Sequence, residues 1–207
     1  MAEVQKHGFV FEEWVKEIFK VAHLAYKYTQ AWDIPGKIHT SIKTVGVKKS
    51  VEFGSTVRIW KATKSFILIV GRWEQIEKRK KFISIDEVKV TPAILKKMKG
   101  NISLNEIIKF DKKIRSFPAG KKGQQLGSKF AAQWKAERKH RMGLLNISAK
   151  LDSKNQRRIQ CNLNYKNYRQ IFGEPCMKTV LRNKKFTVEM NHGPRIFKKK
   201  SNLNLKA

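Results

Sequence analysis

The sequence predicts a mixed α/β fold, in which helices flank a central sheet and a basic α+β region follows toward the C-terminal end. Two patterns carry this prediction: helical periodicity near the N-terminus, and then a hairpin pattern with a continuous apolar run of strand length. Charge is the third observation, because 46 Lys and Arg oppose 16 Asp and Glu, giving a net charge of +30. A chain of 207 residues with 41% hydrophobic content can bury one substantial core, with an appendage.

Residues 7–19 have the spacing of an amphipathic helix. On a helix of this register, Glu12 lies beside the apolar stripe, so its carboxylate can point along the edge of the core toward the strands. Glu13 lies with Lys16 and Glu17 on the solvent side. The apolar stripe itself consists of Phe11, Trp14, Val15, Ile18 and Ala22.

Residues 31–44 predict two short strands joined through the Pro35-Gly36 turn. A hairpin here leaves Lys43 exposed and can bring Asp33 close to it. Period-2 alternation on the second strand sorts its side chains into Ile38, Thr40 and Ile42 on one face and His39, Ser41 and Lys43 on the other.

A carboxylate beside an ammonium at the mouth of a strand pair suits metal-dependent phosphodiester cleavage. Asp33 would hold a hard divalent cation, which prefers oxygen ligands. Lys43 would orient or deprotonate the attacking water, or offset charge on the phosphate. One acid is too few to hold a metal, so we take Glu12 as the second, with Glu13 and Glu52 as alternatives.

Three elements in this order resemble the PD-(D/E)xK nuclease superfamily: a helix with Gly8-x-x-Phe11-Glu12, then Asp33, then a strand ending in x-x-Lys43. Within that superfamily, the segments 32–35 (Trp-Asp-Ile-Pro) and 41–44 (Ser-Ile-Lys-Thr) resemble some type II restriction endonucleases. The resemblance covers residues 7–71. It implies a Mg²⁺-dependent endonuclease with a restriction-endonuclease-like core, in which Asp33 is the metal-bridging acid, Lys43 the catalytic lysine and Glu12 the acid supplied by the helix.

The chain departs from the superfamily pattern at two positions. Trp32 stands where the motif usually has proline, which is a tolerated change. Ser41 stands where a second acid is expected, which removes a metal ligand. Either Glu12 replaces that acid, as helix-supplied acids do elsewhere in the superfamily, or the chain is an inactive relative.

The middle of the chain predicts further elements of an α/β fold. Residues 48–61 have the spacing of a short helix with Phe53 and Trp60 on one side; Arg58, on the other, is either a phosphate contact or simply solvated, the second being favoured. Residues 65–71 form a continuous apolar run, typical of a central strand covered on both faces. Two helices follow: Thr91-Pro92 is the start of the first, and a capping box at 103–106 the start of the second.

The segment 118–123 is the best linker in the sequence. We therefore predict a nuclease core over 1–118 and a basic DNA-binding region over 119–207, with one compact domain as the alternative. Net charge rises along the chain, from +1 over residues 1–47 to +11 over 48–120 and +18 over 121–207. The nearly neutral first part fits acids that serve a cation, and the basic last part fits a surface that lies on phosphates.

Within the basic region, residues 124–141 predict a helix with Phe130 and Trp134 on its buried face. Residues 143–149 and 156–163 predict a β-hairpin, a shape that fits the major groove of DNA. Arg, Gln and Asn are the side chains that pair with base edges. The alternative is that they contact only phosphates, or that they simply solvate the hairpin. The candidate DNA-binding residues are Lys150, Lys154, Gln156, Arg157, Arg158, Gln160 and Asn162.

The charge favours a polyanionic partner, which is either nucleic acid or, less favoured, an anionic membrane surface. The sequence has no apolar run of transmembrane length and no N-terminal signal pattern. Cys161 and Cys176 are too few for a disulfide framework or a zinc site, so we expect buried thiols in a reducing, cytoplasmic setting.

The leading hypothesis is a homodimeric, Mg²⁺-dependent, site-specific endonuclease of type II restriction type that acts on double-stranded DNA. A structure-specific or homing nuclease on the same core is one alternative, because a core reports chemistry rather than target choice. A non-enzymatic basic nucleic-acid-binding protein is another. Metal-free catalysis through His39 or His23 is a third.

Overall fold

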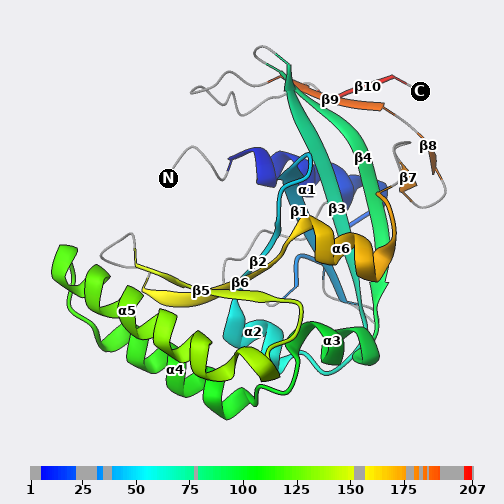
Figure 1. Ribbon diagram of the computed structural model, residues 1–207. Coiled ribbons are helices and arrows are strands. Elements are labelled where there is room, and N and C mark those ends of the chain that lie inside the picture. The colour runs from blue at the N-terminus through cyan, green and yellow to red at the C-terminus, as the bar shows by residue number, and fades with distance from the viewer. Residues whose placement is uncertain are drawn as a thin grey trace. The chain divides into compact units, whose positions relative to one another are not determined.

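The chain folds as a mixed α/β protein with small sheets flanked by helices, as the sequence predicts at the level of fold class (Figure 1). The structure, a computed structural model, divides into two compact units that alternate along the chain. The first comprises residues 1–51, 65–90 and 168–207, and the second 52–64 and 91–167. The residues that the structure describes are 6–21, 32–34, 39–76, 79–151, 157–175, 180–181, 184–185, 187–191 and 203–206.

The first unit is built on a five-stranded sheet with the order β1-β3-β4-β9-β10. β1 runs parallel to β3, whereas β3, β4, β9 and β10 are successively antiparallel, so the sheet is mixed. The apolar run at 65–71 lies in β3, between β1 and β4, which confirms the central strand. The elements of this unit are α1 (Lys6–Ile18), β1 (His39–Gly46), β3 (Phe66–Ile76), β4 (Arg79–Val90), β7 (Val180–Leu181), β8 (Lys184–Lys185), β9 (Thr187–Asn191) and β10 (Leu203–Lys206).

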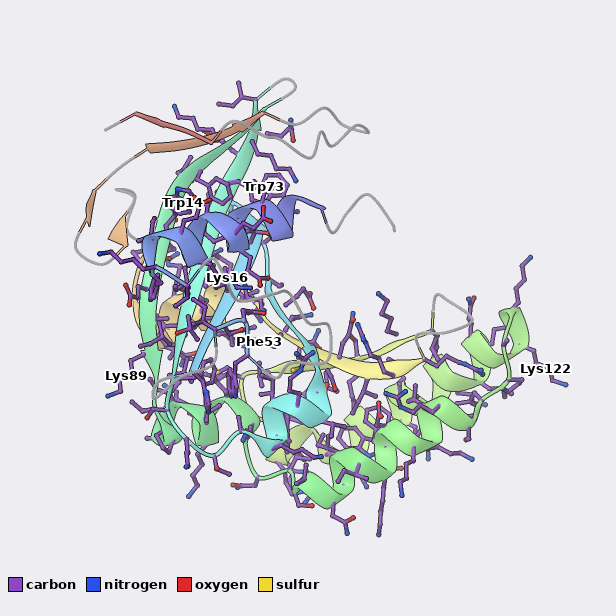
Figure 2. The ribbon with its side chains drawn as sticks, turned by 180° about the vertical axis from the view of Figure 1, so that it is seen from behind. Trp14, Lys16, Phe53, Trp73, Lys89 and Lys122 are labelled. Carbon is purple, nitrogen blue, oxygen red and sulfur yellow. The ribbon has the colours of Figure 1, made fainter. Side chains whose placement is uncertain are left out.

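Helix α1 covers one face of this sheet, and α6 (Tyr165–Phe172), which enters the first unit at Tyr168, lies on the opposite face (Figures 1 and 2). A glycine in β3 brings α1 close to the strands. The ring of Phe11 stacks on Phe82 at 4.8 Å between centroids. A Cβ at Gly71 would lie 2.6 Å from both rings, so only glycine allows this approach. The close contact fixes the height of α1 above the strands, and with it the reach of its polar side chains.

The second unit holds a three-stranded sheet with the order β2-β6-β5. Helices α4 and α5 pack against its hairpin, as Figure 1 shows. No helix in the described parts of the chain is both long and apolar enough to cross a membrane. The elements are β2 (Val51–Ser55), α2 (Thr56–Lys61), α3 (Pro92–Lys99), α4 (Leu104–Ser116), α5 (Lys121–Arg138), a 3₁₀ turn η2 (Lys139–Arg141), β5 (Asn146–Lys150) and β6 (Arg158–Leu163).

One helix prediction was half wrong. Residues 48–61 do not form a single helix, because 51–55 form strand β2 and only 56–61 form helix α2. In β2, Val51 and Phe53 are buried and alternate with Glu52 and Gly54, the period of a strand that pairs with β6. That pairing joins segments far apart in sequence, so the local helical spacing of Phe53 and Trp60 concealed it.

The predicted boundary after Pro118 falls inside the second unit, between α4 and α5. These two helices share an aromatic contact, because Phe110 of α4 stacks on Trp134 of α5 at 4.2 Å between ring centroids. The helix starts themselves are as predicted. The Thr91 side chain accepts a hydrogen bond from the backbone of Ile94, and Ser103 forms a complete capping box.

Glu106 of that capping box also joins α4 to the segment after α5. Its carboxylate pairs with Arg141 at 2.5 Å and with Arg138 at 3.3 Å. The hydrogen bond from Arg141, followed by the backbone bond from Ser103, lowers the pKa of Glu106 to about 2.

We therefore expect Glu106→Gln to lower the unfolding free energy at pH 7 by about 1–2 kcal/mol, after allowance for solvent screening. Glutamine can still complete a capping box, so the change removes the charge alone. A carboxylate with a depressed pKa stabilises the fold above its unfolded value of 4.5, and this stability is lost as pH falls toward about 2. Denaturant unfolding of both proteins from pH 7 to pH 3 should show the difference shrink below about pH 4.5. Glu137→Gln, at an exposed carboxylate that also pairs with Arg138, is the control and should change little.

Candidate active site

A β-bridge holds Asp33 beside strand β1, as the hairpin prediction requires. The backbone N–H groups of Asp33 and Ile34 both donate to the carbonyl of Thr40, at 2.9 and 3.1 Å, and Thr40 N–H donates back to Ile34 at 3.0 Å. The turn at Pro35-Gly36 lies outside the described residues. Trp32 anchors the preceding position, because its ring packs on Phe66 at 4.7 Å between centroids.

The Asp33 carboxylate gathers three donors from β1 onto one of its oxygens. Oδ2 accepts from Ser41 Oγ at 3.2 Å, from the backbone N–H of Ile42 at 2.5 Å and from Lys43 Nζ at 3.1 Å. Lys43 Nζ also donates to the carbonyl of Ile42 at 2.9 Å. The Lys43 side chain is 24% exposed, so it is half-buried rather than exposed as predicted. The bonds fix the ammonium of Lys43 beside the carboxylate of Asp33.

Helix α1 contributes a second carboxylate, that of Glu12, which interacts electrostatically with Asp33. Glu12 is buried and Glu13 is exposed, which confirms the predicted helix face. Burial raises the pKa of Glu12, the hydrogen bond from Lys16 lowers it, and the negative charge of Asp33 raises it again. The positive charge of Lys43 lowers the pKa of Glu12 as well. Glu12, Asp33 and Lys43 therefore lie close enough to interact electrostatically.

The side chain of Lys16 completes this cluster, although it was predicted to face solvent. Its Nζ lies 2.6 Å from Glu12 Oε1, and the residue is only 4% exposed. Glu12, Lys16, Asp33 and Lys43 together form what we call the charge cluster. The spacing of Glu12 and Lys16, one helical turn apart, is the one sequence signal that could have indicated the pair.

The two carboxylates of the charge cluster are of the kind that a magnesium ion prefers. Mg²⁺ in proteins is usually held by one or two carboxylates and keeps several waters. Glu12 and Asp33 are two such acids, and Oδ1 of Asp33 accepts no hydrogen bond from any described residue. No group of three or more His, Cys, Asp or Glu comes together in the part of the chain that is described. A cation would therefore depend on these two acids, solvent and substrate.

Three other residues considered for the site have different surroundings. His39 stacks on Trp32 at 5.2 Å between centroids, and the two ring planes lie 3° apart, so it packs beside the hairpin. Ser41, at the position of the missing acid, uses its hydroxyl to hold Asp33. His23 lies outside the described residues.

Two further candidates belong to the second unit. Glu52 lies in β2, where burial raises its pKa and a hydrogen bond from Asn162 and the charge of Lys150 lower it. The guanidinium of Arg58 in α2 lies near Gly54, and its positive charge lowers the pKa of the Cys161 thiol. Burial raises the pKa of the Cys161 thiol to about 12, so this cysteine is an inert core residue. Cys176 is outside the described residues.

The predicted hairpin of the basic region is present as β5 and β6. Arg158, Gln160 and Asn162 alternate with Ile159, Cys161 and Leu163, which are all fully buried. Across the hairpin, the register pairs Lys150 with Arg158, Ser148 with Gln160 and Asn146 with Asn162. One face of the sheet therefore belongs to the core, and the other carries a row of polar side chains that we call the polar sheet face.

The remaining hairpin candidates divide into two groups. Arg157 donates from Nη1 to the carbonyl of Phe117, so this guanidinium helps to hold the end of α4. Lys154 and Gln156 lie outside the described residues. The candidates that remain on the polar sheet face are Lys150, Arg158, Gln160 and Asn162, of which Asn162 also donates to Glu52.

No protein-family model, curated protein or solved structure matches this chain. Its function therefore has to be inferred from the charge cluster and the polar sheet face.

Proposed function

We propose that the chain is a Mg²⁺-dependent, site-specific endonuclease of type II restriction type that hydrolyses phosphodiester bonds in double-stranded DNA. One observation carries the proposal: Lys43 Nζ lies 3.1 Å from Asp33 Oδ2. The charge of Asp33 also raises the pKa of Glu12 on α1, and the charge of Lys43 lowers it. Two acids and a lysine in this order also resemble the PD-(D/E)xK superfamily. A binding protein would gain nothing from acids that face phosphate, because without a cation they repel it.

Each residue has a distinct role in this proposal. Glu12 and Asp33 would hold the cation, which would supply an activated water and offset charge on the phosphate. Lys43 directs its ammonium to the attacking water or to a phosphate oxygen, where it stabilises charge that develops in the transition state. Ser41 and the backbone of Ile42 keep the Asp33 carboxylate in place through their bonds to Oδ2.

The second unit supports DNA as the substrate. Its polar sheet face carries guanidinium and amide groups, which can pair with guanine and adenine edges. The net charge of +30 favours a polyanion but does not choose between enzyme and binder. Cutting both strands of a palindrome would favour a two-fold homodimer whose symmetry matches the site.

Incubating the purified protein with plasmid DNA, with and without Mg²⁺, tests the proposal directly. We expect discrete fragments that form only with Mg²⁺. Discrete fragments in both samples would contradict the role of the cation and favour histidine-based catalysis. Bound but uncut plasmid in both samples would favour the non-enzymatic nucleic-acid-binding protein. Cutting confined to branched or otherwise irregular DNA would favour a structure-specific nuclease.

For the polar sheet face, we expect Arg158→Ala or Gln160→Ala to weaken binding to the cognate duplex by about 1–3 kcal/mol. Binding to random duplex should change little, because base-edge contacts are made only with the right sequence. Fluorescence anisotropy on both duplexes measures the two affinities. Lys122→Ala, an exposed charge on α5 away from the sheet (Figure 2), is the control. Equal weakening on both duplexes would make the residue a phosphate contact.

A further inference from the structure

Lys16 is a buried lysine inside the candidate active site, and the roles assigned above do not use it. It lies on α1 (Figure 2), is 4% exposed and has its Nζ 2.6 Å from Glu12 Oε1. Burying an ammonium is costly unless it is paired, and the contact with Glu12 offsets part of that cost. Lys16 is thus a fixed positive charge next to one of the two acids.

Formal charges in the cluster balance without any added ion. Glu12 and Asp33 contribute two negative charges, and Lys16 and Lys43 contribute two positive ones. Lys43 is tied to strand β1, where it bonds both Asp33 and the carbonyl of Ile42. The ammonium of Lys16 lies directly on the Glu12 carboxylate, which is where a divalent cation would also bind.

We propose that Lys16 is a positioning residue that competes with the divalent cation for Glu12. In the metal-free protein it holds the Glu12 carboxylate in the cluster and offsets its charge. A cation that binds Glu12 has to displace this ammonium or accept its repulsion, so the protein binds divalent cations weakly in the absence of nucleic acid. This inference depends on the proposed function, because it needs a cation at Glu12 and Asp33.

Competition and simple support predict opposite results when the charge is removed. If Lys16 competes, Lys16→Met should bind a divalent cation more tightly, because a positive charge within a few ångströms of the cation is gone. If Lys16 only holds Glu12 in place, the same change should weaken cation binding. Methionine has a similar length and suits a buried position, so the variant tests the charge rather than the volume.

Electron paramagnetic resonance of free Mn²⁺, titrated into the full chain at pH 8 without DNA, measures the affinity. We expect Lys16→Met to bind Mn²⁺ at least about tenfold more tightly than the wild type. Lys16→Arg keeps the charge and should bind weakly, as the wild type does. Lys20→Met removes an exposed charge just after α1 and should change nothing. Glu12→Gln should bind poorly, because it lacks a ligand.

The outcomes separate this inference from the proposed function. In one outcome, the wild type binds Mn²⁺, Glu12→Gln abolishes that binding, and Lys16→Met binds no more tightly than the wild type. This result would overturn the competition but leave the metal site in place. If neither the wild type nor Lys16→Met binds Mn²⁺, the proposed metal site itself is overturned. If Lys16→Met does not fold, as judged by circular dichroism, Lys16→Gln gives the same comparison with a polar side chain.

Discussion

Lys43→Ala is expected to lower the DNA cleavage rate by at least about 10²–10³-fold while leaving DNA affinity nearly intact. In the proposed mechanism Lys43 places its ammonium where charge develops in the transition state, so its loss should affect the rate far more than the ground-state complex. Its bonds to Asp33 and to the Ile42 carbonyl already orient the group. Single-turnover cleavage and anisotropy on the same duplex measure the two effects separately.

Lys49→Ala is the matched control for this prediction, because it removes an exposed lysine just beyond the same strand. It should cut at the wild-type rate. A thermal melt of Lys43→Ala guards against unfolding, since Asp33 loses an ion-pair partner in that variant. Cleavage by a folded Lys43→Ala at the wild-type rate would remove the main support for the proposed activity.

Asp33→Asn is expected to abolish both Mg²⁺ binding and cleavage. The change keeps the shape of the side chain but removes a negative charge and, in the proposed mechanism, a metal ligand. Metal-free DNA binding should not fall and can rise, because a negative charge facing phosphate has gone. Calorimetric titration with Mg²⁺ and anisotropy in EDTA measure these outcomes. Glu74→Gln, at an exposed acid of β3, is the control, and unchanged Mg²⁺ binding by Asp33→Asn would contradict the site.

The first half of the candidate site could be predicted because its determinants are local. Helical periodicity was enough to choose Glu12 over Glu13, since the apolar stripe defines which side of α1 faces the sheet. The predicted hairpin was enough to bring Asp33 to Lys43, because the bridge between Ile34 and Thr40 sets the register of its two arms. The capping box at Ser103 and Glu106 is local in the same sense.

The rest depends on contacts that one segment does not contain. Lys16 was predicted to face solvent because its position on the helix groups it with Glu13 and Glu17. It is buried instead, in an ion pair with Glu12 one turn earlier on the same helix. Strand β2 exists because β6 pairs with it. The contact of Arg157 with Phe117 also joins distant segments, so the sequence offered Arg157 as a DNA contact instead.

The origin of the second acid is the central claim, and comparing two adjacent glutamates tests it most directly. Cleavage rates of Glu12→Gln and Glu13→Gln, measured side by side with Mg²⁺, separate the buried face of α1 from its exposed face. We expect Glu12→Gln to lose cleavage and Glu13→Gln to keep it, because a surface change away from the site usually alters stability by no more than about 0.5 kcal/mol. Full activity in Glu12→Gln would contradict the account, and its loss in Glu13→Gln would show that the other face of the helix supplies the acid.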